Sequence, residues 1–252
     1  MDLGLKGKNA IVTGGAGGIG LGCAKALAAE GCNIIIADLN DELAAKCADD
    51  IKNEYGVDAW GMKLNVCDQD SIKEFWENVK ENVGVADILV NNVGGRIDRA
   101  PLNELSDEAW LKTFDLTIHS GFYMSKAFCN QFVPDKGKGA IINVTSKSAI
   151  MSSSKGNSHY SSAKAAVIGM TRILAKDVYD LGIRVNCIAP GYVQTERVYP
   201  DGDPRTEEKR KLLLTHDFAK PADLGNVVAF LASEKSYQII GAVIDVTGGT
   251  LC

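Results

Sequence analysis

Hydrophobic and polar positions follow two alternating patterns along the chain: short apolar runs rich in β-branched residues, and longer segments with helical periodicity. The first unit predicts a strand over 9–13, a helix over 18–31 and a second strand over 33–38. These strands carry no polar residue at alternate positions, which is expected when helices cover both faces of a parallel sheet. The chain therefore begins with a βαβ unit.

The same alternation continues to the C-terminal end. Its repetition predicts one α/β domain over 1–252, a three-layer, doubly wound, Rossmann-like fold with a parallel sheet of about seven strands. The segment 192–220 differs, because it is charged and holds two of the six prolines; we expect a substrate-loop insertion with a short helix over the carboxyl ends of the strands. Further strands are predicted at 58–66, 86–92, 139–146, 184–190 and 242–249, and helices at 40–55, 69–83, 106–133 and 158–181.

Composition and cysteine content indicate which binding partners and which cellular compartment to expect. The 252 residues are 46% hydrophobic and 23% charged, with a formal net charge of -5, which argues against nucleic acid or an anionic membrane as the partner. The seven cysteines form no C-x-x-C pair, so reduced thiols are expected. We find no signal peptide and no run of about 18 apolar residues, and the expected location is the cytoplasm.

A glycine-rich turn, TGGAGGIG at 13–20, lies between the first strand and the first helix. Such a turn exposes backbone N–H groups and a helix N-terminus to a phosphate. Asp38 follows at the end of the second strand, where a carboxylate accepts hydrogen bonds from both ribose hydroxyls and repels a 2′-phosphate. Because the turn also has no basic side chain, we predict NAD rather than NADP. The alternative is a plain tight turn, with Asp38 capping the next helix.

Tyr160 and Lys164 are four residues apart at the start of a predicted helix, so their side chains share one helix face. A phenol with an ordinary pKa of about 10 is a poor base at neutral pH, and an adjacent ammonium lowers that pKa. The spacing therefore predicts a tyrosine that shuttles a proton. A core tyrosine beside a lysine that extends to the surface is the structural alternative.

Several motifs, in order and at the usual spacing, resemble the short-chain dehydrogenase/reductase family. They are the turn at 13–20, NNVG at 91–94, NVTS at 143–146, the Tyr160/Lys164 pair, PGYVQT at 190–195 and the closing VTGG. The resemblance implies a Rossmann-like domain, usually a homotetramer, that moves hydride between C4 of a nicotinamide and the carbon of a ketone or secondary alcohol.

The resemblance also implies roles for individual residues. Tyr160 would exchange a proton with the substrate oxygen, Lys164 would bind the nicotinamide ribose and lower the pKa of the phenol, and Ser146 would donate to the substrate oxygen. For Asn91, sheet-end architecture is an equally good interpretation. The implied cofactor contacts are Gly14, Gly18, Ile19 and Gly20 with the phosphates, Asp38 and Asn91 with the adenosine ribose, Asn65 and Val66 with the adenine edge, Tyr160 and Lys164 with the nicotinamide side, and Val193 and Thr195 with the carboxamide.

Three positions depart from the family pattern. Thr117 stands where the family commonly has an asparagine that holds a water in a proton relay toward the lysine, and a hydroxyl lacks the two donors of an amide. Ser146 lies fourteen residues before Tyr160 instead of the usual thirteen, which keeps Ser148 as a fallback. Asn65 replaces a common aspartate, a mild change. We therefore count Thr117 among the catalytic candidates.

The remaining candidates bear on substrate and metal. The three histidines are not at metal-ligand spacing, so no metal is expected. Arg96 could pair with an acidic substrate group, although a solvated loop arginine is the simpler interpretation. The sequence predicts an NAD-dependent alcohol dehydrogenase or ketone reductase acting on a small molecule. The alternatives are a non-catalytic NAD-binding sensor or assembly protein, and a reductase of thioester or acyl-carrier-bound ketones, which NADPH preference and a basic patch at the pocket mouth would mark.

Overall fold

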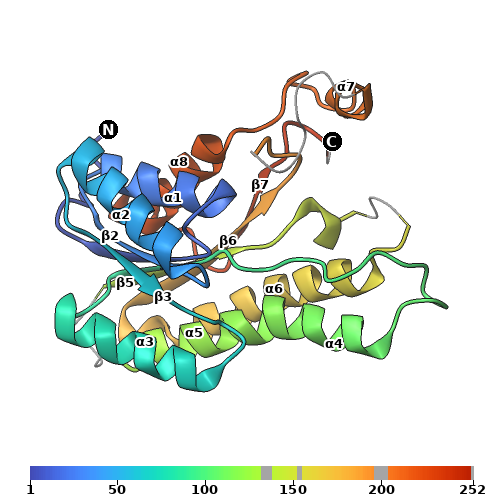
Figure 1. The fold of residues 1–252 in the computed structure, drawn as a ribbon. Coiled ribbons are helices and arrows are strands. Elements are labelled where there is room, and N and C mark those ends of the chain that lie inside the picture. The colour runs from blue at the N-terminus through green and yellow to red at the C-terminus, as the bar shows by residue number, and fades with distance from the viewer. Residues whose placement is uncertain (132–137, 152–154, 196–203, 251–252) are drawn as a thin grey trace.

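A computed structural model describes residues 1–131, 138–151, 155–195 and 204–250. Its strands form one parallel sheet in the order β3-β2-β1-β4-β5-β6-β7 (Figure 1). The order reverses between β1 and β4, which is the switch point where ligands bind in such sheets. The strands are β1 (Asn9–Thr13), β2 (Asn33–Asp38), β3 (Ala59–Lys63), β4 (Ile88–Asn91), β5 (Gly139–Val144), β6 (Ile183–Pro190) and β7 (Val243–Val246).

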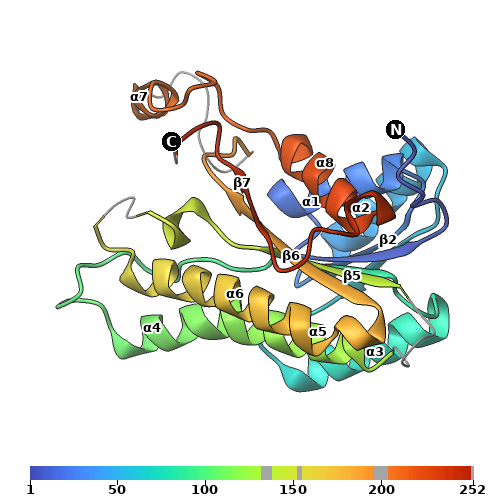
Figure 2. The same cartoon turned by 180° about the vertical axis from the view of Figure 1, so that it is seen from behind.

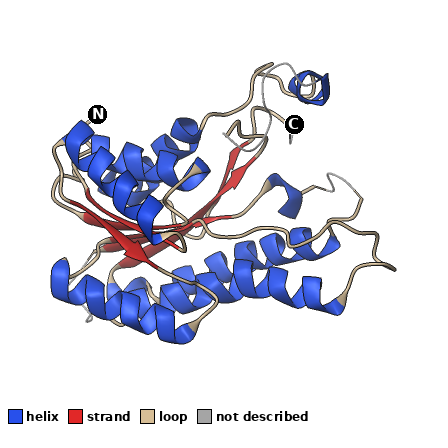
Figure 3. Cartoon of the chain, viewed as in Figure 1, coloured by secondary structure: helices blue, strands red, loops and turns tan. Residues whose placement is uncertain are grey.

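Helices cover both faces of the sheet and give the three layers that the sequence predicted (Figures 1, 2 and 3). One face carries α1 (Gly18–Ala29), α2 (Asp41–Tyr55) and α8 (Pro221–Ala232). The other carries α3 (Gln69–Asn82), the continuous run of α4 (Asp107–Phe114), η1 (Asp115–His119) and α5 (Ser120–Cys129), and α6 (Ser158–Asp177). Short 3-10 turns lie at η2 (Lys147–Ala149), η3 (Tyr179–Leu181) and η4 (Glu234–Ser236), and α7 spans Pro204–Arg210.

The strand register brings the carboxyl ends of the central strands to one edge. Asn91 at the end of β4 pairs with Asn143 of β5, and Asn143 pairs with Cys187 of β6. On the other side of the switch point, β1 ends at Thr13, directly before the glycine turn. Because parallel strands end at the same edge, the motifs that follow β1, β4, β5 and β6 meet there.

The sequence missed one helix, α8, between the loop segment and the last strand. Pro221 occupies its first turn, and Asp223 accepts a hydrogen bond from the Lys220 N–H at 2.7 Å, which satisfies a free donor at the N-terminus. Leu224 and Val228 are fully buried and join the cluster under α1 and α2. The helix therefore completes the layer on that face.

The predicted insertion at 192–220 contains the short helix α7, which extends beyond the carboxyl end of β7 (Figures 1 and 2). The part at 196–203 lies outside the described residues. Within the described residues no helix combines the length and the apolarity needed to cross a membrane. The cysteines in those ranges are all unpaired.

Candidate active site

The glycine turn after β1 forms one wall of a cavity of about 1150 Å³. Gly14, Gly18 and Asp38 line it together with Thr195, which follows β6. Thr195 lies close to the turn, since a Cβ added to Gly18 would be 3.6 Å from its Cγ2. Two of the predicted cofactor-binding segments, far apart in sequence, therefore face the same cavity.

The turn has the shape that a dinucleotide phosphate needs. No side chain caps the N-terminus of α1 at Gly17, so its first N–H groups remain available to an anion. Gly20 permits the tight approach, because a Cβ there would collide with the Gly14 carbonyl oxygen. Asn92, which sequence reasoning left without a role, donates from Nδ2 to the carbonyl oxygens of Thr13 and Gly14 at 3.0 and 3.2 Å. Ile19 packs beneath the turn against the core.

Asp38 ends β2 at the edge of this cavity. Its Oδ2 accepts a hydrogen bond from the Ala16 N–H at 3.2 Å and its Oδ1 accepts one from the Asn40 N–H at 3.1 Å. Asn40, not Asp38, caps α2, with its Oδ1 accepting from the Leu43 N–H. The simple capping alternative for Asp38 therefore fails, and the carboxylate is fixed beside the glycine turn.

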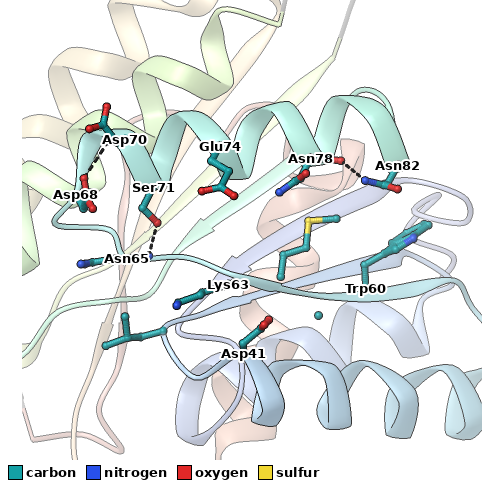
Figure 4. Close-up of a pocket in the computed structure, with 13 residues that line it drawn as sticks. Asp41, Trp60, Lys63, Asn65, Asp68, Asp70, Ser71, Glu74, Asn78 and Asn82 are labelled. Atoms are coloured by element: carbon teal, nitrogen blue, oxygen red, sulfur yellow. Dashed lines mark hydrogen bonds between the residues drawn. The ribbon is translucent and has the colours of Figure 1, made fainter.

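Asn65 lies in a neighbouring pocket of about 900 Å³ between β3 and α3 (Figure 4). Its backbone N–H donates to Ser71 Oγ at 3.0 Å, and its side-chain oxygen accepts from the Cys67 N–H at 3.1 Å. The side-chain amide group is thus tied into the turn that precedes α3. Val66 is buried and packs into the core under α3, α5 and α6.

Asn91 is buried in a polar network between the sheet and the helices. Its Nδ2 donates to Ser125 Oγ at 3.0 Å and to Asn143 Oδ1 at 2.9 Å, and Asn143 donates onward to Thr171 Oγ1 at 2.9 Å. These bonds join β4, β5, α5 and α6. The side chain therefore has the sheet-end architectural role that the sequence left open, and its contact with a nucleotide stays a prediction.

Ser146, Tyr160 and Lys164 converge where β5 ends and α6 begins. Ser146 follows β5, and its hydroxyl hydrogen-bonds Tyr160 in the first turn of α6. Lys164, one turn later, is buried and donates from Nζ to the Val144 carbonyl at 2.7 Å. Ser148 uses its backbone N–H to donate to Ser146 Oγ at 3.1 Å. The serine that hydrogen-bonds the phenol is Ser146.

The electrostatics of Tyr160 differ from the prediction. Burial raises the pKa of its phenol above the ordinary value, and the Ser146 hydrogen bond and the Arg96 charge offset part of this rise. Lys164 is not among the groups that shift the pKa of Tyr160, and its ammonium donates to the Val144 carbonyl. Burial also lowers the pKa of Lys164 to about 8. The expected lowering of the phenol pKa by Lys164 is therefore wrong for this structure.

Thr117 lies in η1, a π-helical turn inserted between α4 and α5. The residue is buried, and its Oγ1 has no hydrogen-bond partner among the described residues. It lies close to Lys164: a Cβ placed on Gly94 would be 2.6 Å from Lys164 Nζ and 3.4 Å from Thr117 Cγ2. Single π-turns of this kind occur frequently at functional sites. Thr117 and Lys164 thus lie near the same glycine, and the role of Thr117 in a proton relay stays a prediction.

The turn after β6 supplies the last candidates. Val193 is buried and pairs as an isolated bridge with Ala219, while Gln194 and Thr195 face the cofactor cavity. Tyr192 packs against Phe218, with ring centroids 5.7 Å apart. This turn therefore joins the cofactor cavity to the segment that precedes α8.

Sequence reasoning gave no role to Lys147 or Asn157. Arg96 Nη1 donates to Asn157 Oδ1 at 2.7 Å, which fixes the guanidinium near Tyr160. Lys147 is buried next to Ser146, with Nζ 3.3 Å from the centroid of the Tyr192 ring. The sequence offered one signal for Lys147, because this lysine directly follows Ser146, just after the end of β5.

Comparisons with known proteins agree with this geometry over nearly the whole chain. A family model described as Enoyl-(Acyl carrier protein) reductase matches residues 14–250. The chain is 32% identical over 249 residues to the 3-oxoacyl-[acyl-carrier-protein] reductase FabG of Aquifex aeolicus, covering 99% of each protein. It is 34% identical over 250 residues to the FabG of Thermotoga maritima, covering 97% of this chain and 98% of that protein.

Two solved structures have the same fold. L-sorbose reductase from Gluconobacter frateurii, solved with NADPH and L-sorbose, superposes with a TM-score of 0.91 at 29% identity, covering 100% of this chain and 99% of that one. The NADPH-dependent 3-quinuclidinone reductase from Rhodotorula rubra gives a TM-score of 0.90 at 28% identity, covering 99% and 93% of the two chains.

Proposed function

Because the chain belongs to the short-chain dehydrogenase/reductase family, whose members are nicotinamide-dependent oxidoreductases, we propose that it interconverts a small-molecule ketone and its secondary alcohol with NAD as cofactor. One observation carries the proposal: Ser146 hydrogen-bonds Tyr160, and buried Lys164 lies in the next turn of the same helix. A protein that only binds dinucleotides has no need of this combination. The proposed activity thus rests on the geometry at the start of α6.

In the proposed mechanism each of the three side chains has a separate task. Ser146 holds the substrate oxygen beside the phenol of Tyr160, so the charge that develops there meets a fixed donor. Tyr160 gives its proton to that oxygen during reduction and removes it during oxidation. Lys164 would hydrogen-bond the nicotinamide ribose, and its own bond to the Val144 carbonyl holds the ammonium in place. When bound, the nicotinamide supplies the hydride to the carbonyl carbon, or accepts it from the carbinol carbon.

The cofactor preference rests on Asp38. Its carboxylate is held beside the glycine turn by the N–H groups of Ala16 and Asn40, so it cannot readily move away from a 2′-phosphate placed there. A fixed negative charge at this point disfavours NADP and favours the two ribose hydroxyls of NAD. L-sorbose reductase was solved with NADPH, and 3-quinuclidinone reductase is NADPH-dependent. The proposed preference for NAD therefore rests on Asp38 of this chain and not on these two structures.

The relatives favour a second candidate, the reduction of a 3-oxoacyl thioester on an acyl carrier. Both FabG relatives match the chain over nearly its full length at 32% and 34% identity. An acetoacetyl thioester offered with NADPH distinguishes the two candidates, because a 3-oxoacyl reductase turns it over faster than simple ketones with NADH.

The test is a fluorescence titration with NADH and NADPH, followed by turnover of ketones, secondary alcohols and the acetoacetyl thioester. We expect tighter binding of NADH than of NADPH. We expect Tyr160→Phe to lower kcat about 10²- to 10⁴-fold while changing NADH affinity far less. Tyr179→Phe, at an exposed tyrosine beyond the end of α6, is the matched control. Tighter NADPH binding would contradict the role of Asp38. Binding without turnover over the panel would favour the alternative of a non-catalytic sensor.

A further inference from the structure

Lys147 is a buried cation without a polar partner. It is only 7% exposed, yet among the described residues no hydrogen bond or ion pair to its ammonium is found. The ammonium lies against the face of the Tyr192 ring, with Nζ 3.3 Å from the ring centroid. An aromatic face attracts a cation but accepts no proper hydrogen bond, so the contact with Tyr192 leaves the N–H donors of this ammonium available to another acceptor.

A second cation approaches the same ring. Lys209 of α7 lies with Nζ 5.8 Å from the Tyr192 centroid, and its charge adds to burial in lowering the pKa of Lys147 to about 8. Two like charges on one aromatic platform repel each other unless negative charge is brought between them. A negative charge beside Lys147 would therefore be favourable.

This positive site adjoins the proposed reaction centre. Lys147 directly follows Ser146, whose hydroxyl bonds Tyr160, and Tyr192 lies in the turn that leads to Val193 and Thr195. Arg96, the residue that the sequence suggested for an acidic substrate, already donates to Asn157 at 2.7 Å. Of these two cations near Ser146 and Tyr160, Lys147 is the one without a polar partner for its ammonium in the part of the chain that the structure describes.

We propose that Lys147, held on the Tyr192 ring beside Ser146, binds an anionic group of the substrate, either a carboxylate or a phosphate ester. The inference rests on the proposed oxidoreductase function and adds the chemical class of the substrate. A simple 3-oxoacyl thioester has no charge near its reacting carbon and gains nothing from this contact. The site thus favours small oxo acids, oxo phosphates or the corresponding alcohols.

The first experiment compares matched pairs of ketones: acetoacetate with its methyl ester, and hydroxyacetone phosphate with hydroxyacetone. We expect wild type to have a higher kcat/KM for the charged ketone than for the neutral one in one of the two pairs. A preference for acetoacetate would identify a carboxylate as the bound group, and a preference for hydroxyacetone phosphate would identify a phosphate ester. Lys147→Met should lower kcat/KM for that charged ketone about 10- to 100-fold, mainly through KM, and leave its neutral partner nearly unchanged. Lys147→Arg should retain part of the preference, and Lys176→Met, at an exposed lysine of α6, should retain all of it.

Equal losses for charged and neutral ketones in Lys147→Met would show a purely structural lysine and overturn the proposal. So would a wild type that prefers neither charged ketone. Thermal unfolding with malonate or inorganic phosphate gives a readout that needs no turnover, because a ligand bound only to the folded state raises Tm. We expect one of these anions to raise Tm of wild type more than that of Lys147→Met. A larger rise in Tm for wild type, without turnover of any ketone, would reject the proposed oxidoreductase function and support the anion site. Turnover of ketones without this difference in Tm would reject the anion site and leave the proposed function intact.

Discussion

At the scale of single residues, the surroundings of Tyr160 decide how the proposed reaction responds to pH. Burial holds the phenol protonated by raising its pKa, and this favours the proton donor needed for ketone reduction. Alcohol oxidation needs the phenolate, so its rate should rise with pH through and beyond the neutral range. Ser146 and Arg96 partly oppose burial, which makes Arg96 a test of this balance.

We expect Arg96→Ala to shift the alkaline limb of the oxidation profile to higher pH. Loss of the guanidinium removes a charge that favours the phenolate, so the pKa of Tyr160 rises further and less base is present at any pH below it. Oxidation at neutral pH should slow by about two- to five-fold, as expected for one partly exposed charge, while reduction changes little. The measurement is kcat/KM for a secondary alcohol against pH. Arg99→Ala, at an exposed neighbour, is the control, and superimposable profiles for wild type and Arg96→Ala would refute this role.

At the scale of elements, the π-turn η1 carries the Thr117 hydroxyl, which makes no hydrogen bond to the described residues. Thr117 Oγ1 is buried without a partner among the described residues, and a buried unpaired hydroxyl contributes no stability. Its proximity to Gly94 and Lys164 suggests that it serves a proton path toward the lysine. Stability and activity should therefore respond differently to its removal.

We predict that Thr117→Val, which keeps the shape and deletes the hydroxyl, changes the free energy of unfolding by no more than about 1 kcal/mol. The same substitution should lower kcat several-fold, because the proposed relay loses its only hydroxyl at this point, whereas Thr117→Asn should keep or raise kcat. Denaturant unfolding and steady-state kinetics on both variants give the answer. Wild-type turnover in Thr117→Val would mean that no relay passes through this turn.

Several elements were predictable because their signal is local. The glycine turn, the strand before it and the helix after it lie within one short stretch of sequence, and the structure has all three. α8 was missed although its start carries a local signal, Pro221 in the first turn with Asp223 two residues later. The π-turn left no signal in the sequence, since helical periodicity at 106–133 continues through it.

The same distinction explains which parts of the site could be predicted. Tyr160 and Lys164 share a helix face, so their placement follows from spacing alone. The contact of Lys147 with Tyr192 joins segments 45 residues apart and depends on the pairing of β5 with β6. Burial of the Tyr160 phenol, which raises its pKa, also depends on tertiary packing, and this is why the sequence misjudged the pKa of Tyr160.

At the scale of the whole molecule, the parallel sheet lets distant segments cooperate at one edge. The glycine turn follows β1, the Ser146 motif follows β5 and the Tyr192 turn follows β6, and the register aligns the ends of the central strands. α7 then extends over the end of β7 and brings Lys209 to the Tyr192 ring (Figure 1). Different loops at one edge of the sheet can therefore determine which cofactor binds, which reaction is catalysed and whether a charged substrate is preferred.

The helices on the α4–α6 face raise the question of assembly. Leu111 of α4, Phe122 of α5 and Ile173 of α6 are large apolar side chains that are exposed in the single chain. Apolar side chains left exposed on a folded chain are candidates for an interface, and the family resemblance implied a homotetramer with interfaces on these helices. We therefore expect the protein to be a homo-oligomer in solution that buries this face.

Light scattering coupled to gel filtration should give a mass that is a multiple of 26.9 kDa, with four copies as the expectation. Leu111→Asp together with Ile173→Asp should shift the mass toward smaller species, because a charge buried in a subunit contact costs several kcal/mol unless it is paired. Leu212→Asp, at an exposed leucine outside these helices, should leave the mass unchanged. A monomeric wild type would remove the assembly prediction and leave the proposed chemistry intact, because every residue assigned to the reaction comes from one chain.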